Sequence, residues 1–346
     1  MRTVLIIQIN PSDSDLRVTT PTAREGAIVK IQVAALTATI LCLVLGRIDA
    51  QWDQFSNDCP RFTIEASTAL LTRAGDDNNI PLVSNELTLA PVFDSYQATS
   101  LGSTPSLELA AMFQTRSGHH WEIETTFARW DNSIGLFGPD LTTPFLPGLN
   151  PDTVNYNYDS ELFSIEFNFR QKCMPGLTFL IGPRYISLEE HVDFSSQTLI
   201  VFPPPFDNLD FTTNNTIDTN NPLIGGQIGL EWDFLLTRDL FVSSFIKVGG
   251  FANNARATLT SETTIQDLLE ERRTKNTGSF VGELGGRLNF NILGPAFTGF
   301  VGYQAMWIDG VALAPTQFIN VNSNGALFVE NTPSFHGAVF GIQANY

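Results

Sequence analysis

The sequence predicts an all-β fold, a transmembrane antiparallel up-and-down β-barrel of about 10–14 strands, with a short helix expected in one loop. Three observations carry this prediction. Apolar and polar residues alternate with period two after residue 60, which sorts them onto two faces of a strand. Only 16% of the 346 residues are charged while 43% are hydrophobic, and soluble domains carry roughly 25% charged residues. Short and long connections also alternate along the chain, as they do in membrane barrels.

Alternation is clearest over residues 163–170, where Phe163, Ile165 and Phe167 share one face and Ser, Glu, Asn and Arg take the other. Ten segments qualify as strands on this pattern: 62–72, 106–115, 120–130, 161–171, 177–189, 223–235, 240–251, 279–292, 296–307 and 334–346. Further strands remain open at 82–93 and at 194–202 or 326–330. Single-chain bacterial barrels favour even strand numbers.

The connections between these segments are of two kinds. Those at 173–176 and 291–295 are short, and the polar stretches 131–160, 190–221, 252–279 and 309–333 are long. Within the third long stretch, Ser261 and Glu262 could cap a helix that runs to Arg273. We expect this helix in a loop outside the membrane.

The N-terminal region contains a predicted export signal. Lys30 precedes an apolar run over 31–46, and Ile48-Asp49-Ala50 before Gln51 offers a cleavage site, although Ile48 is larger than the residue usual there. We therefore expect an N-terminal extension and signal peptide over 1–50, a short leader over 51–60 and one barrel domain over 61–346. A retained single-span anchor is the alternative, and the true translation start stays open.

Charge and cysteine content restrict the partners. The net charge of −17 disfavours nucleic acid, which needs a basic surface. Cys59 and Cys173 would remain after export and could form a disulfide or stay free thiols. The Cys and His residues have no metal-binding spacing, so we expect neither a metal nor another cofactor.

No catalytic residues are expected, and the sequence predicts that the protein is not an enzyme. His191 with Ser187 or Ser195 is the one local grouping that could suggest nucleophilic catalysis. Serine is common and histidine is often structural, so this grouping is a weak signal.

The chain ends in an amphipathic segment. Phe340, Ile342, Ala344 and Tyr346 share one face, and the last residue is aromatic. This ending resembles the signal by which bacterial outer-membrane barrels are assembled, so we assign Phe340, Ile342 and Tyr346 to membrane assembly. The closing strand of a soluble β-sandwich is the alternative.

Several stretches resemble the β-barrel porin families known from planctomycete-type bacteria. They are built from Gly, aromatics and alternation, and they lie at 121–124, 180–186, 249–255 and 302–307. The resemblance covers most of residues 60–346. It implies an outer-membrane barrel and supplies no catalytic motif.

The polar face of the predicted strands is expected to line the lumen. The candidate lumen-lining residues are Glu65, Glu108, Glu122, Glu124, Glu166, Arg170, Glu231, Asp233, Glu283 and Arg287, to which Arg184 could be added. Their acidic excess predicts a mild preference for cations, because charged rings bias ion passage. Alternatively, these groups pair with one another and fill a narrow barrel.

The sequence thus favours a porin that lets ions or small solutes diffuse through the bacterial outer membrane. Its expected partners are outer-membrane lipid, the barrel-assembly machinery and the solutes, and a homo-oligomer stays open. Two alternatives remain, namely a non-conducting barrel with a structural or surface-interaction role and a secreted soluble β-sandwich binding module. The solute, the state of the pore and the strand number are not fixed by the sequence.

Overall fold

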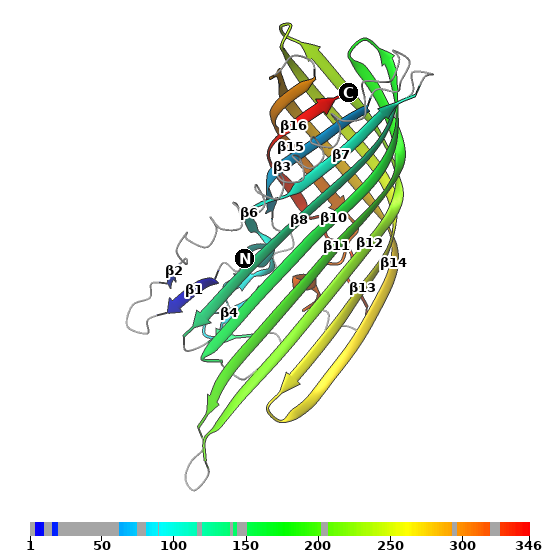
Figure 1. Cartoon of the computed structure of the whole chain (residues 1–346). Coiled ribbons are helices and arrows are strands. Elements are labelled where there is room, and N and C mark those ends of the chain that lie inside the picture. Colours follow the sequence, from blue (N-terminus) through cyan, green and yellow to red (C-terminus); the bar gives the residue numbers. More distant parts are fainter. Residues whose placement is uncertain are drawn as a thin grey trace, which may run out of the picture.

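The computed structural model describes residues 62–74, 81–88, 90–115, 120–138, 141–143, 151–201, 207–292, 296–318 and 326–346, and the backbone of 4–9 and 16–19. Within these ranges, ten antiparallel strands pair in a closed ring (Figure 1). The ring strands are β3 (Phe62–Ala74), β7 (Leu107–Gln114), β8 (His120–Phe137), β10 (Thr153–Met174), β11 (Leu177–Ile200), β12 (Leu209–Leu235), β13 (Leu240–Thr263), β14 (Gln266–Asn291), β15 (Phe297–Asp309) and β16 (Ser334–Asn345).

The ring closes between its first and last strands. The Phe62 N–H donates to the Tyr346 carbonyl at 3.1 Å, and the Tyr346 N–H donates to the Phe62 carbonyl at 2.8 Å. Phe340 of the predicted assembly signal is exposed on the outer face, and Ile342 is half-buried. The C-terminal residue therefore completes the barrel wall, while its recognition by an assembly machinery stays a prediction.

Each of the ten predicted segments contributes one ring strand, but most strands are longer than predicted. β10 to β14 have 22 to 27 residues each, whereas about 9–11 suffice to cross a membrane. The predicted loops over 131–160, 190–221 and 252–279 are therefore largely strand. Their polar composition did not signal loops, because it belongs to strand segments whose outer face is polar. The closed ring also shows that the soluble β-sandwich alternative is wrong.

The barrel has two different ends. The turn end holds the short connections after β10 and β12 together with Phe62 and Tyr346, and the loop end holds the long connections. β10 to β14 run past the ends of β15, β16, β3 and β7 toward the loop end (Figure 1).

The apolar face of a strand points outward near the turn end and inward near the loop end. In β10, Phe163 and Phe167 near the turn end are exposed while Glu166 is buried. Toward the loop end of the same strand, Tyr156 and Tyr158 are buried and the alternate positions are polar. The outer face is therefore apolar only in the part of each strand near the turn end.

The exposed apolar side chains form a belt around the turn-side half, here called the lipid-facing belt. Its members are Ile123, Phe127, Phe163, Ile165, Phe167, Ile181, Ile228, Leu230, Ile246, Phe280, Leu284, Leu288, Val301 and Phe340. Water-soluble monomers rarely expose a contiguous apolar surface of this extent. The belt therefore marks the membrane-spanning half of the barrel.

Segments between the ring strands fill the loop end from inside. These inserted segments, whose described parts are residues 81–88 with 90–105 and residues 310–318 with 326–331, carry β4 (Pro81–Asn85), β5 (Pro91–Asp94), α2 (Ser95–Thr99), β6 (Leu101–Pro105) and α3 (Ala314–Gln317). β4 and β5 form a small second sheet with β9 (Leu141–Thr142), and β6 pairs with β3. The ring of Phe93 meets the ring of Tyr156 edge to face, with 5.0 Å between the ring centres. The ring centres of Phe318 and Phe194 are 5.7 Å apart. The loop-side half thus has an apolar core.

One further local prediction is wrong. The expected helix between Ser261 and Arg273 is absent, since these residues form the hairpin of β13 and β14 with a turn at 264–265. Residues 252–261 pair continuously with residues 269–278. The backbone N–H and C=O groups that a helix would have bonded internally are therefore bonded between two strands.

The optional strands also have different outcomes. Residues 194–200 extend β11, and 81–94 join the small second sheet rather than the ring. Residues 326–330 form no strand, although the adjacent Asn331 bridges to Val311.

At the N-terminus, β1 (Val4–Ile9) pairs in parallel with β8, and β2 (Leu16–Thr19) pairs with β1. The predicted signal over 30–50 and the leader over 51–60 lie outside the described residues, as does Cys59. Cys173 is exposed. Because Cys59 is outside the described residues, the disulfide between Cys59 and Cys173 stays a prediction. In the described part of the chain, no helix has the length and apolar character needed to cross a membrane.

The belt predicts how a new charge acts on each half of one strand. Leu284→Arg places a cation on the lipid-facing surface of β14 and should destabilise the barrel by about 2–4 kcal/mol, the range for charges facing lipid. Asn276→Arg, at an exposed outward position nearer the loop end, should have almost no effect. Urea unfolding in lipid vesicles measures both, and equal losses would contradict the assignment of the belt.

Candidate functional site

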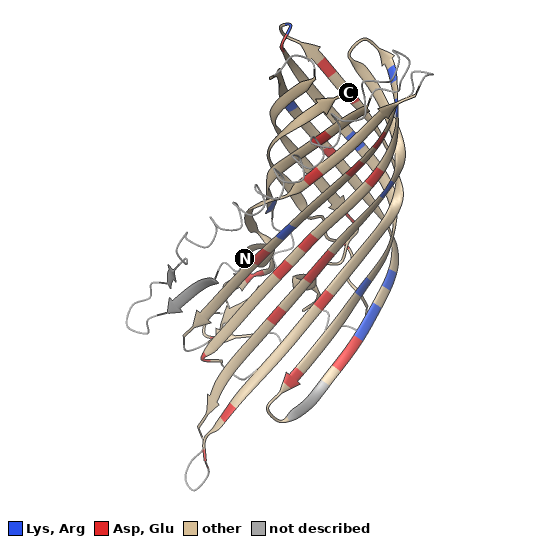
Figure 2. Cartoon of the chain, viewed as in Figure 1, with Lys and Arg blue, Asp and Glu red and all other residues tan. Residues whose placement is uncertain are grey.

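The inward face of the membrane-spanning half is charged. We call these side chains the interior network: Glu65, Glu108, Glu122, Glu124, Glu166, Arg170, Arg184, Glu231, Asp233, Lys247, Glu283 and Arg287. They comprise eight carboxylates and four cations, and Figure 2 shows acidic and basic residues interspersed along the strands. Period-two alternation places them inside because the outer positions of the same strands hold the belt.

Lys247 connects three strands of the ring. From β13, its Nζ donates to Glu124 on β8 at 3.0 Å and to Glu166 on β10 at 2.5 Å. These strands are not neighbours of β13, so the contacts cross the space that the ring encloses. Lys247 is only 7% exposed, and a buried ammonium needs such partners to offset its lost hydration.

Arg184 makes the second crossing. Its Nη1 lies 2.8 Å from Glu283 on β14 and 3.3 Å from Glu166 on β10. Its Nε donates to Ser164 at 2.9 Å, and Nη1 also donates to the Gln227 side chain at 3.2 Å. The guanidinium is thus held on several sides.

Two further arginines complete the set of cations. Arg170 forms ion pairs with Glu122 and Glu231. Arg287 pairs with Glu65 at 2.5 Å, and its guanidinium lies 4.6 Å from the centre of the Phe300 ring. Aromatic faces attract cations, so this stacking adds to the ion pair.

In the described part of the chain, two predicted lumen residues form no ion pair with a cation of the network. Glu108 accepts hydrogen bonds from Ser67 at 3.0 Å and from Gln304. Asp233 is exposed near the turn end and accepts a hydrogen bond from Ser243 at 2.7 Å.

The structure therefore brings nine of the ten predicted lumen residues into one buried or half-buried interior, with Asp233 at its mouth. Their role in lining a conducting pore stays a prediction. Sequence reasoning missed Lys247 and named Arg184 only as an addition. Both lie in segments, 240–251 and 177–189, where apolar residues occupy both phases, so alternation alone did not assign a face.

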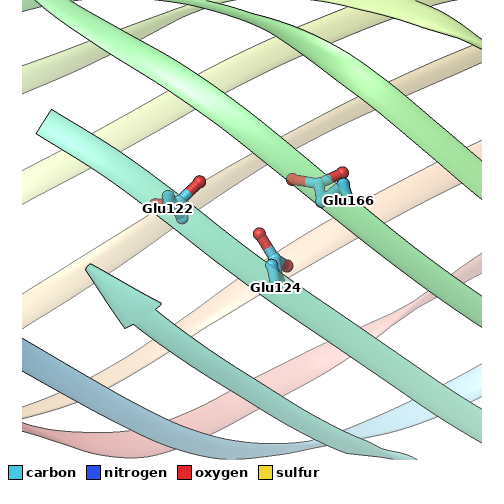
Figure 3. A group of neighbouring side chains, drawn as sticks. All are labelled: Glu122, Glu124 and Glu166. Atoms are coloured by element: carbon cyan, nitrogen blue, oxygen red, sulfur yellow. The ribbon is translucent and has the colours of Figure 1, made fainter. Parts of the chain in front are cut away.

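Glu122, Glu124 and Glu166 form a group whose nearest oxygen atoms all lie within 4.8 Å of one another. Figure 3 shows them directed into the same space from β8 and β10. Such a group could hold a metal ion, since hard cations prefer oxygen ligands. Here Lys247 and Arg170 donate to it, so cationic side chains of the chain already offset its charge.

The enclosed space between the interior network and the apolar core is small. A cavity of about 20 Å³ is lined in part by Glu108, Glu124, Arg184, Glu283 and Met306. This volume suffices for about one water molecule. The side chains around this cavity leave no room for a larger solute in this conformation.

The inserted segment over 310–331 is anchored to the wall by polar contacts. Glu190 accepts from Arg73 at 2.6 Å and from the Ala314 N–H at 2.8 Å. Asn221 accepts from the Ala312 N–H at 2.8 Å, and Asn253 donates to the Gly310 carbonyl at 3.0 Å. These bonds fix the start of the segment against β11, β12 and β13.

His191 lies outside the barrel on the polar outer face of the loop-side half. Its Nδ1 is 2.6 Å from Asp218 and its Nε2 is 3.2 Å from Asp193. The hydrogen bond with Asp218 raises the pKa of His191 to about 9, although partial burial opposes the shift. Ser187 donates to Glu189 instead of His191. With both ring nitrogens facing carboxylates, His191 is poorly placed to act as a base.

The closed ring, the lipid-facing belt and the charged interior together define an outer-membrane β-barrel of the porin class. The chain belongs to the family described as Putative beta barrel porin-7 (BBP7), whose model matches residues 143–346, more than half of the chain. The match includes every ring strand from β10 to β16. Among curated proteins, no sequence matches this chain.

Several solved barrels are similar to most of the chain at low identity. The outer membrane protease OmpT from Escherichia coli is 8% identical with a TM-score of 0.42, covering 85% of this chain and 99% of that chain. The translocator domain of autotransporter NalP from Neisseria meningitidis is 8% identical with a TM-score of 0.32, covering 90% and 97%. The Pseudomonas putida toluene transporter TodX is 9% identical with a TM-score of 0.30, covering 84% and 90%. Likeness at this level transfers no activity to the chain.

The network predicts a large cost for removing a buried cation. Arg184→Met leaves Glu166 and Glu283 without one of their partners and should destabilise the barrel by about 3–5 kcal/mol. Arg272→Met removes an exposed arginine paired with Glu270 at 2.7 Å and should cost less than about 1 kcal/mol. Urea unfolding of the refolded barrel distinguishes the two, and a neutral Arg184→Met would contradict a tightly paired interior.

His191 predicts a pH-dependent contribution to stability. Because its folded pKa is raised from 6.5 to about 9, its contribution is fully present below pH 6.5 and is lost as pH rises through about 9. When the pH is raised from 6.5 to about 9, the unfolding midpoint of the parent should fall. This fall should be slightly larger than the fall of the unfolding midpoint of His191→Gln. Equal falls would show that the pairing with Asp193 and Asp218 adds nothing.

Proposed function

We propose that the protein is a passive channel for ions or small solutes with a mild preference for cations. The observation that carries this proposal is the acidic interior network inside the half that the lipid-facing belt surrounds. Eight carboxylates against four cations leave an acidic excess, and fixed charge along a lumen biases which ions pass. The family assignment to porins supports the same function.

In this conformation the loop end of the barrel is filled. The inserted segments pack an apolar core at the loop end, and the cavity below them measures about 20 Å³. Conduction therefore requires that the described part of the second inserted segment leaves its place against Glu190, Asn221 and Asn253. It also requires that the ion pairs across the ring leave space for a solute. These polar anchors lie at one end of the segment, whereas Leu313, Phe318 and Leu327 hold it in the apolar core.

A non-conducting barrel with a structural or surface-interaction role is the second candidate. It is favoured by the same small cavity, because side chains can fill a narrow barrel permanently. In that case the ion pairs of the interior network serve only to hold the wall together.

The remaining parts of the proposal concern the cell. We propose export through the signal over 1–50, insertion by the barrel-assembly machinery with Phe340, Ile342 and Tyr346 as its signal, and residence in a bacterial outer membrane. We further propose that the protein is not an enzyme and binds no nucleic acid. Association of copies in the membrane is compatible with this function and is not required by it.

The decisive test shortens the inserted segment. Val311 and Asn331 form an isolated antiparallel bridge, so residues 312–330 can be replaced by an Asn-Gly turn, which suits such a closure. The shortened barrel should show single-channel steps in a planar bilayer that the parent shows rarely, with a reversal potential in a salt gradient that favours cations.

A barrel shortened in the connection between β11 and β12 is the matched control and should behave like the parent. Folding is verified by heat-modifiable gel mobility. A shortened barrel that folds but stays silent would favour the non-conducting candidate, and a clear preference for anions would refute the cation preference.

A further inference from the structure

We propose that Lys247 is the residue that determines ion selectivity, acting as a tethered cation in the place that a permeating cation would occupy. This inference rests on the proposed function as a channel. It assigns a particular role to one side chain of the interior network, whereas the proposed function depends only on the excess of carboxylates.

The place of the ammonium is defined by the three-carboxylate group. Glu122, Glu124 and Glu166 offer oxygen atoms within 4.8 Å of one another (Figure 3). Lys247 donates to two of them, at 3.0 Å and 2.5 Å. A cation passing along this wall would seek the same oxygens, because carboxylates are preferred ligands of hard cations.

Lys247 differs from the arginines in how it is held. Arg184 has Ser164, Gln227 and two carboxylates as partners, which fixes its planar group. The two hydrogen bonds of Lys247 are both with this carboxylate group, and its Nζ lies 5.5 Å from the centre of the Phe245 ring. A lysine ammonium is a compact charge on a flexible stem, so it can yield to a competing cation while the arginines keep their positions.

With Lys247 in this place, the lumen prefers cations less strongly than it would with the carboxylates alone. While the ammonium stays between Glu124 and Glu166, it reduces the attraction that the group exerts on a second cation. Without it, the group keeps Arg170 and Arg184 as partners but has one space for an external cation. Lys247 therefore sets how strongly the lumen prefers cations.

The test uses the barrel in which an Asn-Gly turn replaces residues 312–330, so that current can be measured. Lys247→Met should raise the cation-to-anion permeability ratio about fivefold, the factor expected for one charge acting over about 4 Å of water. It should also make the current sensitive to block by Mn²⁺, and adding Glu124→Gln should relieve that block. Lys275→Met is the matched control, because Lys275 is exposed on β14 outside the network and its loss changes net charge equally.

Lys247→Gln, which can still donate to Glu124 and Glu166, replaces the methionine variant if that variant does not fold. A permeability ratio equal to that of Lys275→Met, with no block by Mn²⁺, would overturn the role of Lys247 and leave the channel function intact. If the shortened barrels fold but none conducts, the proposed function itself fails and the selectivity role fails with it.

Discussion

Every backbone N–H and C=O group within the hydrocarbon of a membrane needs a partner in the protein, and the architecture of this chain follows from that constraint. Ten antiparallel strands meet the constraint only as a closed ring, which the reciprocal bonds of Phe62 and Tyr346 complete. Closure then separates two environments. One set of alternate side chains faces lipid, and the other is confined inside a narrow space.

That confinement explains the interior network. Charged groups removed from bulk water are stable only when they are paired and hydrogen-bonded. Lys247 and Arg184 reach across the ring for this reason, and each contacts carboxylates on strands distant in sequence. The same contacts fill the lumen, so the acidity that would attract cations and the pairing that restricts their passage come from the same residues.

Beyond the belt the outer environment changes from lipid to water, and the two faces of the strands exchange roles. The outer face becomes polar, as His191 with its two aspartates shows, and the inner face becomes apolar. Apolar walls left open to water would be unfavourable. The inserted segments cover them, with Phe93 against Tyr156 and Phe318 against Phe194. The closed loop end is therefore a consequence of long strands rather than an addition to a finished pore.

The sequence by itself determined the barrel class, the places of ten strands and most of the charged interior, whereas the tertiary structure decided that the ring has no further strand among the described residues. Period-two alternation is a local property, and residues such as Phe163 and Glu166 reveal their faces within a few positions. Only the tertiary structure decided the length of β10 to β14, the fate of 261–273 and the contacts of Lys247. Each depends on what a residue meets across the ring or beyond the membrane surface. A polar outer strand has the composition of a loop, and a lysine in an apolar segment shows no partner until distant strands bring Glu124 and Glu166 to it.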